Sequence, residues 1–129
     1  MSEQLRIALP PDSAAPGIAR NFVVDRGAGL PVNMVTDAEL LVSELVSNAV
    51  LHGSPEITLR VALDPSRIGV AVHDEGASVP STSVAPPPRT MSSGRGLMIV
   101  DRLSAAWGVT LSDPPPGKTV WFELGAGTS

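Results

Sequence analysis

The chain has 129 residues, a net charge of −4 and no cysteine. Its length favours one domain with a real hydrophobic core, and the lack of cysteine excludes disulfides, thiol nucleophiles and thiolate metal sites. The acidic balance, without a basic cluster, argues against a nucleic-acid partner. No apolar run is long enough to cross a bilayer and the N-terminus lacks the features of a signal peptide, so we expect a cytoplasmic protein that binds no membrane.

The first elements in chain order are a predicted strand and a predicted helix. The segment EQLRIALP alternates apolar and polar residues, which predicts a strand that stops at Pro10. Asp12 or Ser13 can cap a following helix, whose apolar residues recur at spacings of three and four. Gly27 begins the loop that ends this helix.

A second helix is predicted from about residue 36 to residue 52. Thr36 followed by Glu39 is a capping-box pattern in front of an apolar run. Gly53 stands where a left-handed C-terminal cap belongs.

The middle of the chain predicts an antiparallel hairpin. Apolar residues alternate with other residues over 57–63, and an apolar run follows over 68–72, with a turn at 64–66 between them.

The remaining third combines a long loop with a helix and two strands. Residues 74–94 contain four prolines and few residues to bury, and so long a loop in a small domain is usually a lid or disordered. Residues 97–103 suit a helix that residues 106–107 close, before a final strand pair over 109–111 and 120–124.

Two glycine motifs do not match the nucleotide-binding signatures that they suggest. Gly117-Lys118-Thr119 is like the end of a P-loop, but the first glycine of that motif would fall at Ser112, and the segment leads into a strand instead of a helix. Gly94-Arg95-Gly96 begins a dinucleotide fingerprint whose third glycine would fall at Ile99. The two histidines belong to no known ligand pattern, so no dedicated zinc site is predicted.

Three polar residues form a stripe on the second predicted helix. Glu44, Asn48 and His52 follow each other at intervals of four, so their side chains line up along one face. Such a stripe must face water, a polar partner or a ligand. An ordinary amphipathic face explains it equally well when it is taken alone. However, Asn is unfavourable inside a helix, and an amide one turn from a carboxylate suits Mg²⁺ near a phosphate chain.

Two further segments fit a nucleotide site when they are combined with this stripe. Asp74 ends a predicted strand, where its carboxylate can accept a hydrogen bond from an amino group such as that of adenine, and Gly76 allows close backbone approach. Gly94 and Gly96 precede a predicted helix, whose backbone N–H groups can receive phosphate. Each segment alone is also explained as a plain turn or a plain helix start.

The order and spacing of these segments resemble the ATP-binding domain shared by gyrase, heat-shock chaperones, histidine kinases and MutL proteins, the GHKL or Bergerat fold. The resemblance covers roughly residues 5–124. In detail ELVSNAVLHG, VHDEGASVP, SGRGLMIVDRLSAAWG and GKTVWFEL are similar to the anti-sigma-factor serine kinases of partner-switching systems.

The resemblance implies a fold and a domain organisation. We expect an α+β two-layer sandwich, in which a mixed, mainly antiparallel sheet is covered on one face by about three helices. Residues 1–129 would form a single ATP-binding kinase domain, with a mobile ATP lid over about 81–93 that is short for the family.

The resemblance also implies a site for ATP and Mg²⁺. Glu44 would be the general base, Asn48 would bind Mg²⁺, and Asp74 would accept from the adenine amino group. The remaining nucleotide contacts would come from residues that surround the base, the ribose and the phosphates: His52, Gly76, Gly94, Arg95, Gly96, Leu97 and Thr119. Thr119 in particular would support the adenine end beside Asp74.

The implied function is an ATP-dependent protein-serine kinase that is also an anti-sigma factor. It would phosphorylate an anti-anti-sigma (STAS) protein on serine and sequester a sigma factor, and the family leads us to expect a homodimer. Two alternatives stay open: a nucleotide-responsive regulatory protein with little or no kinase activity, and an ATP-hydrolysing domain of a larger sensory system.

Overall fold

The computed structural model describes residues 3–76, 106–112 and 116–125. The predicted lid at 81–93, the helix expected over 97–103 and the Gly94–Leu97 segment lie outside these residues.

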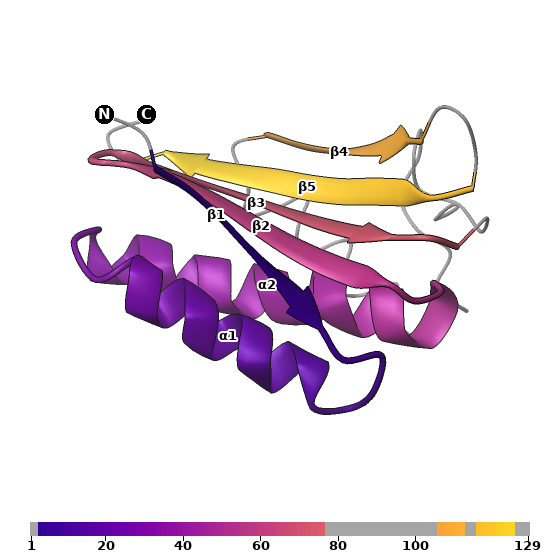
Figure 1. The fold of residues 1–129 in the computed structure, drawn as a ribbon. Coiled ribbons are helices and arrows are strands. Elements are labelled where there is room, and N and C mark those ends of the chain that lie inside the picture. Colours follow the sequence, from indigo (N-terminus) through magenta and orange to yellow (C-terminus); the bar gives the residue numbers. More distant parts are fainter. Residues whose placement is uncertain (1–2, 77–105, 113–115, 126–129) are drawn as a thin grey trace, which may run out of the picture.

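The described residues form two layers, an antiparallel sheet and a pair of helices (Figure 1). The elements along the chain are β1 (Glu3–Leu9), α1 (Ala15–Arg26), α2 (Val32–His52), β2 (Ile57–Asp64), β3 (Arg67–Asp74), β4 (Ala106–Leu111) and β5 (Lys118–Gly125). The strand order is β1-β2-β3-β5-β4, and each neighbouring pair is antiparallel. This confirms the predicted α+β sandwich and its mainly antiparallel sheet.

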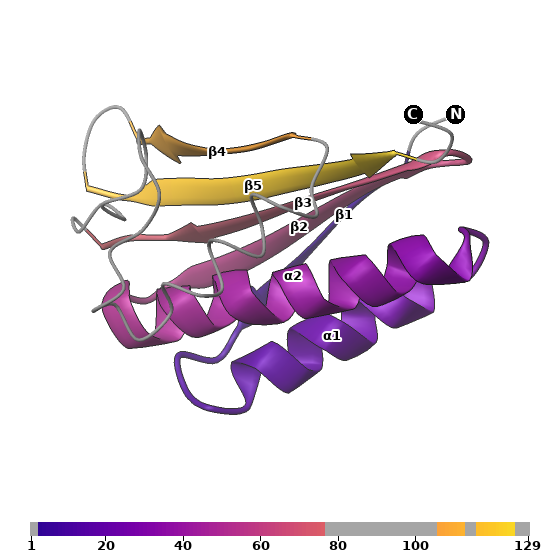
Figure 2. The ribbon, with the colours of Figure 1, turned by 180° about the vertical axis from the view of Figure 1, so that it is seen from behind.

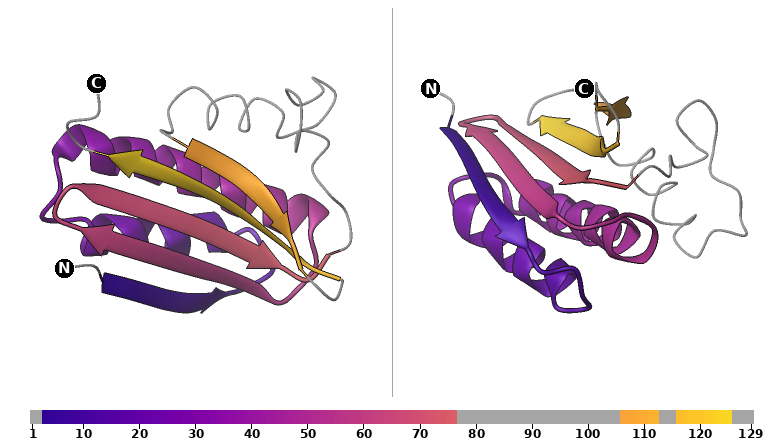
Figure 3. Two further views of the ribbon diagram at one scale, coloured as in Figure 1. Left: turned by 90° about the horizontal axis from the view of Figure 1, so that it is seen from above. Right: turned by 45° about the vertical axis from the view of Figure 1, so that its right-hand side comes forward.

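Both helices lie on the same face of the sheet, as the view from behind also shows (Figure 2). Seen from above, they run beneath the strands, whose other face no described helix covers (Figure 3). None of the helices in the described part of the chain is both long and apolar enough to cross a membrane.

The core lies between the sheet and the helices. Alternate residues of each central strand point toward the helices, because successive side chains of a strand face opposite sides. The apolar positions of α2 recur at spacings of three and four, so they form one buried face. The largest fully buried side chains come from the central strands and from α2: Phe122, Leu41, Leu45, Ile57, Leu59 and Ile68.

The prediction that Asp12 or Ser13 caps the first helix was wrong, because α1 begins at Ala15 with Ala14 as its N-cap residue and no side-chain cap hydrogen bond. Oδ1 of Asp12 accepts a hydrogen bond of 2.8 Å from the backbone N–H of Ala14, so the aspartate orders the turn that precedes α1.

The predicted start of α2 was wrong. The helix begins at Val32, directly after Pro31, whose carbonyl accepts from the N–H of Val35. Thr36 and Glu39 therefore lie inside the helix and form no capping box. Met34 is buried, so tertiary packing adds a first turn that the local cap pattern did not indicate.

The predicted left-handed cap at Gly53 was also wrong. This glycine is extended, with φ −96° and ψ −163°, and its N–H donates to the carbonyl of Ala49.

The hairpin β2–β3 is confirmed, including its turn. The backbone N–H of Ser66 donates to Oδ1 of Asp64 over 2.9 Å, which holds the pKa of that exposed carboxyl below its usual value. The last strand pair is confirmed as well, but β4 starts earlier than predicted. Ala106 and Trp107 pair with Glu123 and Phe122 instead of closing a helix.

A substitution at Phe122 tests whether the core lies between the sheet and the helices. Its side chain is fully buried, so we expect Phe122→Ala to lower the free energy of unfolding by about 3–5 kcal/mol in urea denaturation. Val32→Ala, at a residue 79% exposed, is the matched control and should change it by about 0.5 kcal/mol or less. Equal losses in the two variants would contradict this core.

Candidate functional site

The carboxylate of Asp74 lies at a junction of three elements. It ends β3 on the face that packs against the helices and is 2% exposed. Its Oδ1 accepts from the backbone N–H of Gly76 over 2.7 Å and from that of Ser54, just beyond α2, over 3.3 Å. The ammonium of Lys118, the first residue of β5, donates to the same oxygen over 3.0 Å. The described donors therefore all reach Oδ1.

Two glycines allow the backbone to approach this carboxylate. A Cβ on Gly53 would lie 2.5 Å from Cγ of Asp74, and one on Gly76 would lie 2.9 Å from its Oδ1. Neither distance leaves room for a side chain. Close approach to Asp74 therefore explains Gly53, which the sequence pattern had suggested as a left-handed cap.

Lys118 is a site residue that the sequence analysis did not find. Its side chain is 6% exposed and forms a buried ion pair with Asp74. One signal was present in the sequence. Residues 118, 120, 122 and 124 share one face of the last strand, and the other three are core residues.

Thr119 lies on the other face of the sheet. Its Oγ1 is 3.0 Å from Nδ1 of His73, whose Nε2 is 2.8 Å from a carboxylate oxygen of Glu75. His73 directly precedes Asp74 and therefore points away from it. The structure thus brings Lys118 to Asp74, and it does not bring the Thr119 hydroxyl there.

The stripe on α2 runs toward this junction. Glu44 and Asn48 are partly buried and His52 is exposed, and Gly53 follows directly. Both polar side-chain atoms of Asn48, Nδ2 and Oδ1, are buried and have no hydrogen-bond partner in the part of the chain that the structure describes. An unpaired buried amide costs free energy, and this cost is offset when a ligand supplies the missing partners.

The donor set fits a magnesium ion that is held mainly by other groups. Within residues 3–76, 106–112 and 116–125, no three His, Asp or Glu side chains gather closely enough to hold a metal ion. Mg²⁺ usually takes one or two protein oxygens and completes its shell with waters and phosphates. The unpartnered amide oxygen of Asn48 is suited to such a role.

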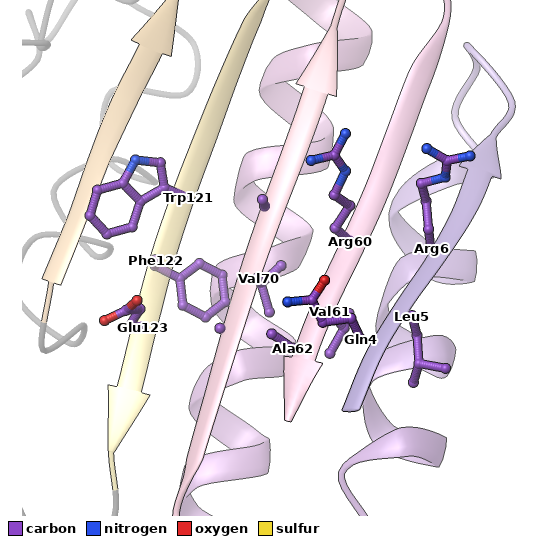
Figure 4. A pocket seen from close by; sticks show the side chains of 12 residues that line it. Gln4, Leu5, Arg6, Arg60, Val61, Ala62, Val70, Trp121, Phe122 and Glu123 are labelled. Carbon is purple, nitrogen blue, oxygen red and sulfur yellow. The ribbon is translucent and has the colours of Figure 1, made fainter. Parts of the chain in front are cut away.

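A separate hollow of about 530 Å³ lies on the open face of the sheet. Arg6, Arg60, Trp121 and Glu123 stand around it on β1, β2 and β5 (Figure 4). It is remote from the Asp74 junction, because these residues lie on the face opposite to the helices.

Two solved structures share this fold over most of the chain. The RsbU and RsbW domains of Rv1364c from Mycobacterium tuberculosis match with a TM-score of 0.70 and 21% identity, over 95% of this chain and 32% of that one. The histidine kinase domain of a blue-light activated histidine kinase from Erythrobacter litoralis matches with a TM-score of 0.57 and 21% identity, over 87% of this chain and 59% of that one. This chain therefore spans about a third to three fifths of these proteins.

No curated protein sequence matches the chain significantly. The family model described as the histidine kinase-like ATPase domain matches residues 11–124, which include α1, α2, the Asp74 junction and most of β5. The chain therefore belongs to the histidine kinase-like ATPase domain family.

Proposed function

We propose that the chain is an ATP-dependent protein-serine kinase and anti-sigma factor of a partner-switching system. In this role it phosphorylates an anti-anti-sigma (STAS) protein on serine and sequesters a sigma factor. Membership in a kinase-like ATPase family supports phosphotransfer. The observation that carries the site is the buried amide of Asn48, which has no partner among the described residues and lies on α2, the helix whose C-terminal end packs against Asp74.

The positions along α2 suit a nucleotide that lies along the helix. At 1.5 Å per residue, Asn48 is about 7 Å and Glu44 about 13 Å before Gly53, which packs against Asp74. The base would bind at Asp74, with Gly76 giving it room, and the phosphates would extend toward Asn48 and Glu44. His52, between these ends, would approach the ribose or a phosphate, and the Gly94–Leu97 segment, with Arg95, would line the phosphates.

Asn48 would hold Mg²⁺ through its amide oxygen. When bound, this ion neutralises charge on the phosphates during transfer. Most of the rate enhancement would then come from positioning and electrostatics.

Glu44 would accept the proton of the substrate hydroxyl. The serine oxygen forms a bond to the γ-phosphorus as the bond from that phosphorus to the β-phosphate oxygen breaks, and ADP leaves. The carboxylate stands one helical turn from Asn48, so both can face the γ-phosphate.

The anti-sigma role rests on the sequence resemblance and on a fold shared with a protein that contains an RsbW domain. Dimerisation and contacts with the two partner proteins belong to the same proposal. A regulatory protein that binds nucleotide without phosphotransfer is the alternative.

Substitution of Glu44 tests its proposed role as the general base. Glu44→Gln should keep its affinity for Mg·ATP, because the neutral amide has the same shape, and should lose phosphotransfer by about a hundredfold or more. Radiolabelled ATP with candidate STAS proteins measures transfer, and calorimetry measures binding. Glu39→Gln, on the same helix, is the control. Transfer by Glu44→Gln at the wild-type rate would exclude Glu44 as the base. If the wild-type protein itself binds Mg·ATP but transfers no phosphate, the regulatory alternative is favoured.

A substitution at Asn48 separates ligand binding from folding. Asn48→Leu replaces two unpaired buried polar atoms with apolar ones of similar size, so the free protein should be as stable as wild type or more stable by about 1–2 kcal/mol. The same variant should lose the Mg²⁺-dependent part of ADP affinity. Urea denaturation and calorimetry give the two readouts. A free protein destabilised by more than about 1 kcal/mol would assign Asn48 a structural role instead.

A further inference from the structure

The ion pair between Lys118 and Asp74 requires an explanation beyond folding. Lys118 is the only lysine in the chain, and it occupies the end of a strand face that is otherwise formed by Val120, Phe122 and Leu124. Its ammonium and the carboxylate are both nearly excluded from water. Burying two charges in this way is often no more favourable than an apolar pair of the same size, so the pair is weak evidence for a purely stabilising role.

The pair places a hydrogen-bond donor beside an acceptor. The two groups are 3.0 Å apart, and an ammonium has three N–H groups, of which one is directed at Oδ1 of Asp74. The backbone donors from Gly76 and Ser54 also reach Oδ1. None of these three donors is directed at Oδ2, so Oδ2 would be the oxygen that accepts from a base.

The edge of adenine has the complementary order. Its 6-amino group is a donor and the neighbouring ring nitrogen N1 is an acceptor, whereas a 6-keto purine has an acceptor at position 6 and an N–H at N1. A carboxylate alone contacts only the amino group. A carboxylate with an adjacent ammonium matches both atoms of adenine and presents a donor to the N1–H of a 6-keto purine.

We propose that Lys118 is a second base-reading residue, which donates a hydrogen bond to N1 of adenine while Asp74 accepts from the 6-amino group. This inference rests on the proposed ATP binding and concerns the specificity of the same site. It gives Lys118 the position beside Asp74 that the family resemblance had implied for Thr119, whose hydroxyl lies on the other face.

The test compares ADP with 1-deaza-ADP, in which a C–H replaces N1. Calorimetric titrations of the full chain in Mg²⁺ buffer give the affinity of each nucleotide for wild type, Lys118→Met and Thr119→Val. In wild type and in Thr119→Val, the analogue should bind about tenfold more weakly than ADP, because a charge-assisted hydrogen bond is lost. In Lys118→Met, the two nucleotides should bind within about twofold of each other.

Lys118→Met leaves Asp74 as an unpaired buried carboxylate, which itself destabilises the fold. The double variant Asp74→Asn with Lys118→Met removes both charges and keeps an acceptor for the amino group of adenine. It replaces the single variant in the nucleotide comparison if the single variant does not fold. It should also fail to distinguish the two nucleotides.

The outcomes separate this inference from the proposed function. Wild type that binds neither nucleotide overturns both. Wild type that binds ADP and the analogue equally overturns the inference alone. The inference is also overturned if 1-deaza-ADP binds more weakly than ADP by the same factor in wild type and in the Lys118 variants. It is likewise overturned if this loss of affinity disappears only in Thr119→Val.

Discussion

The buried carboxylate of Asp74 is the constraint on which the candidate site depends. A carboxylate that is 2% exposed must be supplied with donors, and here they come from three separate places in the chain. The N–H of Ser54 fixes the end of α2, the N–H of Gly76 fixes the chain after β3, and Lys118 fixes the start of β5. One side chain therefore ties together the elements that would surround a nucleotide.

Helix α2 serves the core and the candidate site at once. Its apolar positions, Leu41, Leu45, Val46 and Ala49 among them, are buried in the core. Its polar stripe keeps an amide without partners at Asn48, which costs stability in the free protein. Sites that bind ligands commonly retain such local costs, since the unpaired groups find their partners in the complex. The helix is thus anchored in the core through its apolar face while its polar stripe lies at the candidate site.

Most of the fold could be predicted from the sequence, because strand alternation and helical spacing are local signals. The hairpin β2–β3 and the stripe on α2 are examples. The start of α2, the extended Gly53 and the strand residues Ala106 and Trp107 were missed. Each depends on a distant contact: the packing of Met34, the approach to Asp74 and the pairing with β5. Lys118 was missed for the same reason, since its partner is 44 residues away. The roles of all the predicted site residues remain predictions, and four of these residues, Gly94, Arg95, Gly96 and Leu97, lie outside the described part of the chain.

The most direct test of the central claim is to locate the nucleotide by NMR. In a titration of the ¹⁵N-labelled protein with Mg·ADP, the account predicts that the amide signals of Ser54 and Gly76 and the side-chain amide of Asn48 shift and reach saturation. The indole N–H signal of Trp121, on the open face of the sheet, should not move. Shifts that instead centre on Trp121 and its neighbours Arg6 and Arg60, or no shifts at all, would contradict a nucleotide site at Asp74.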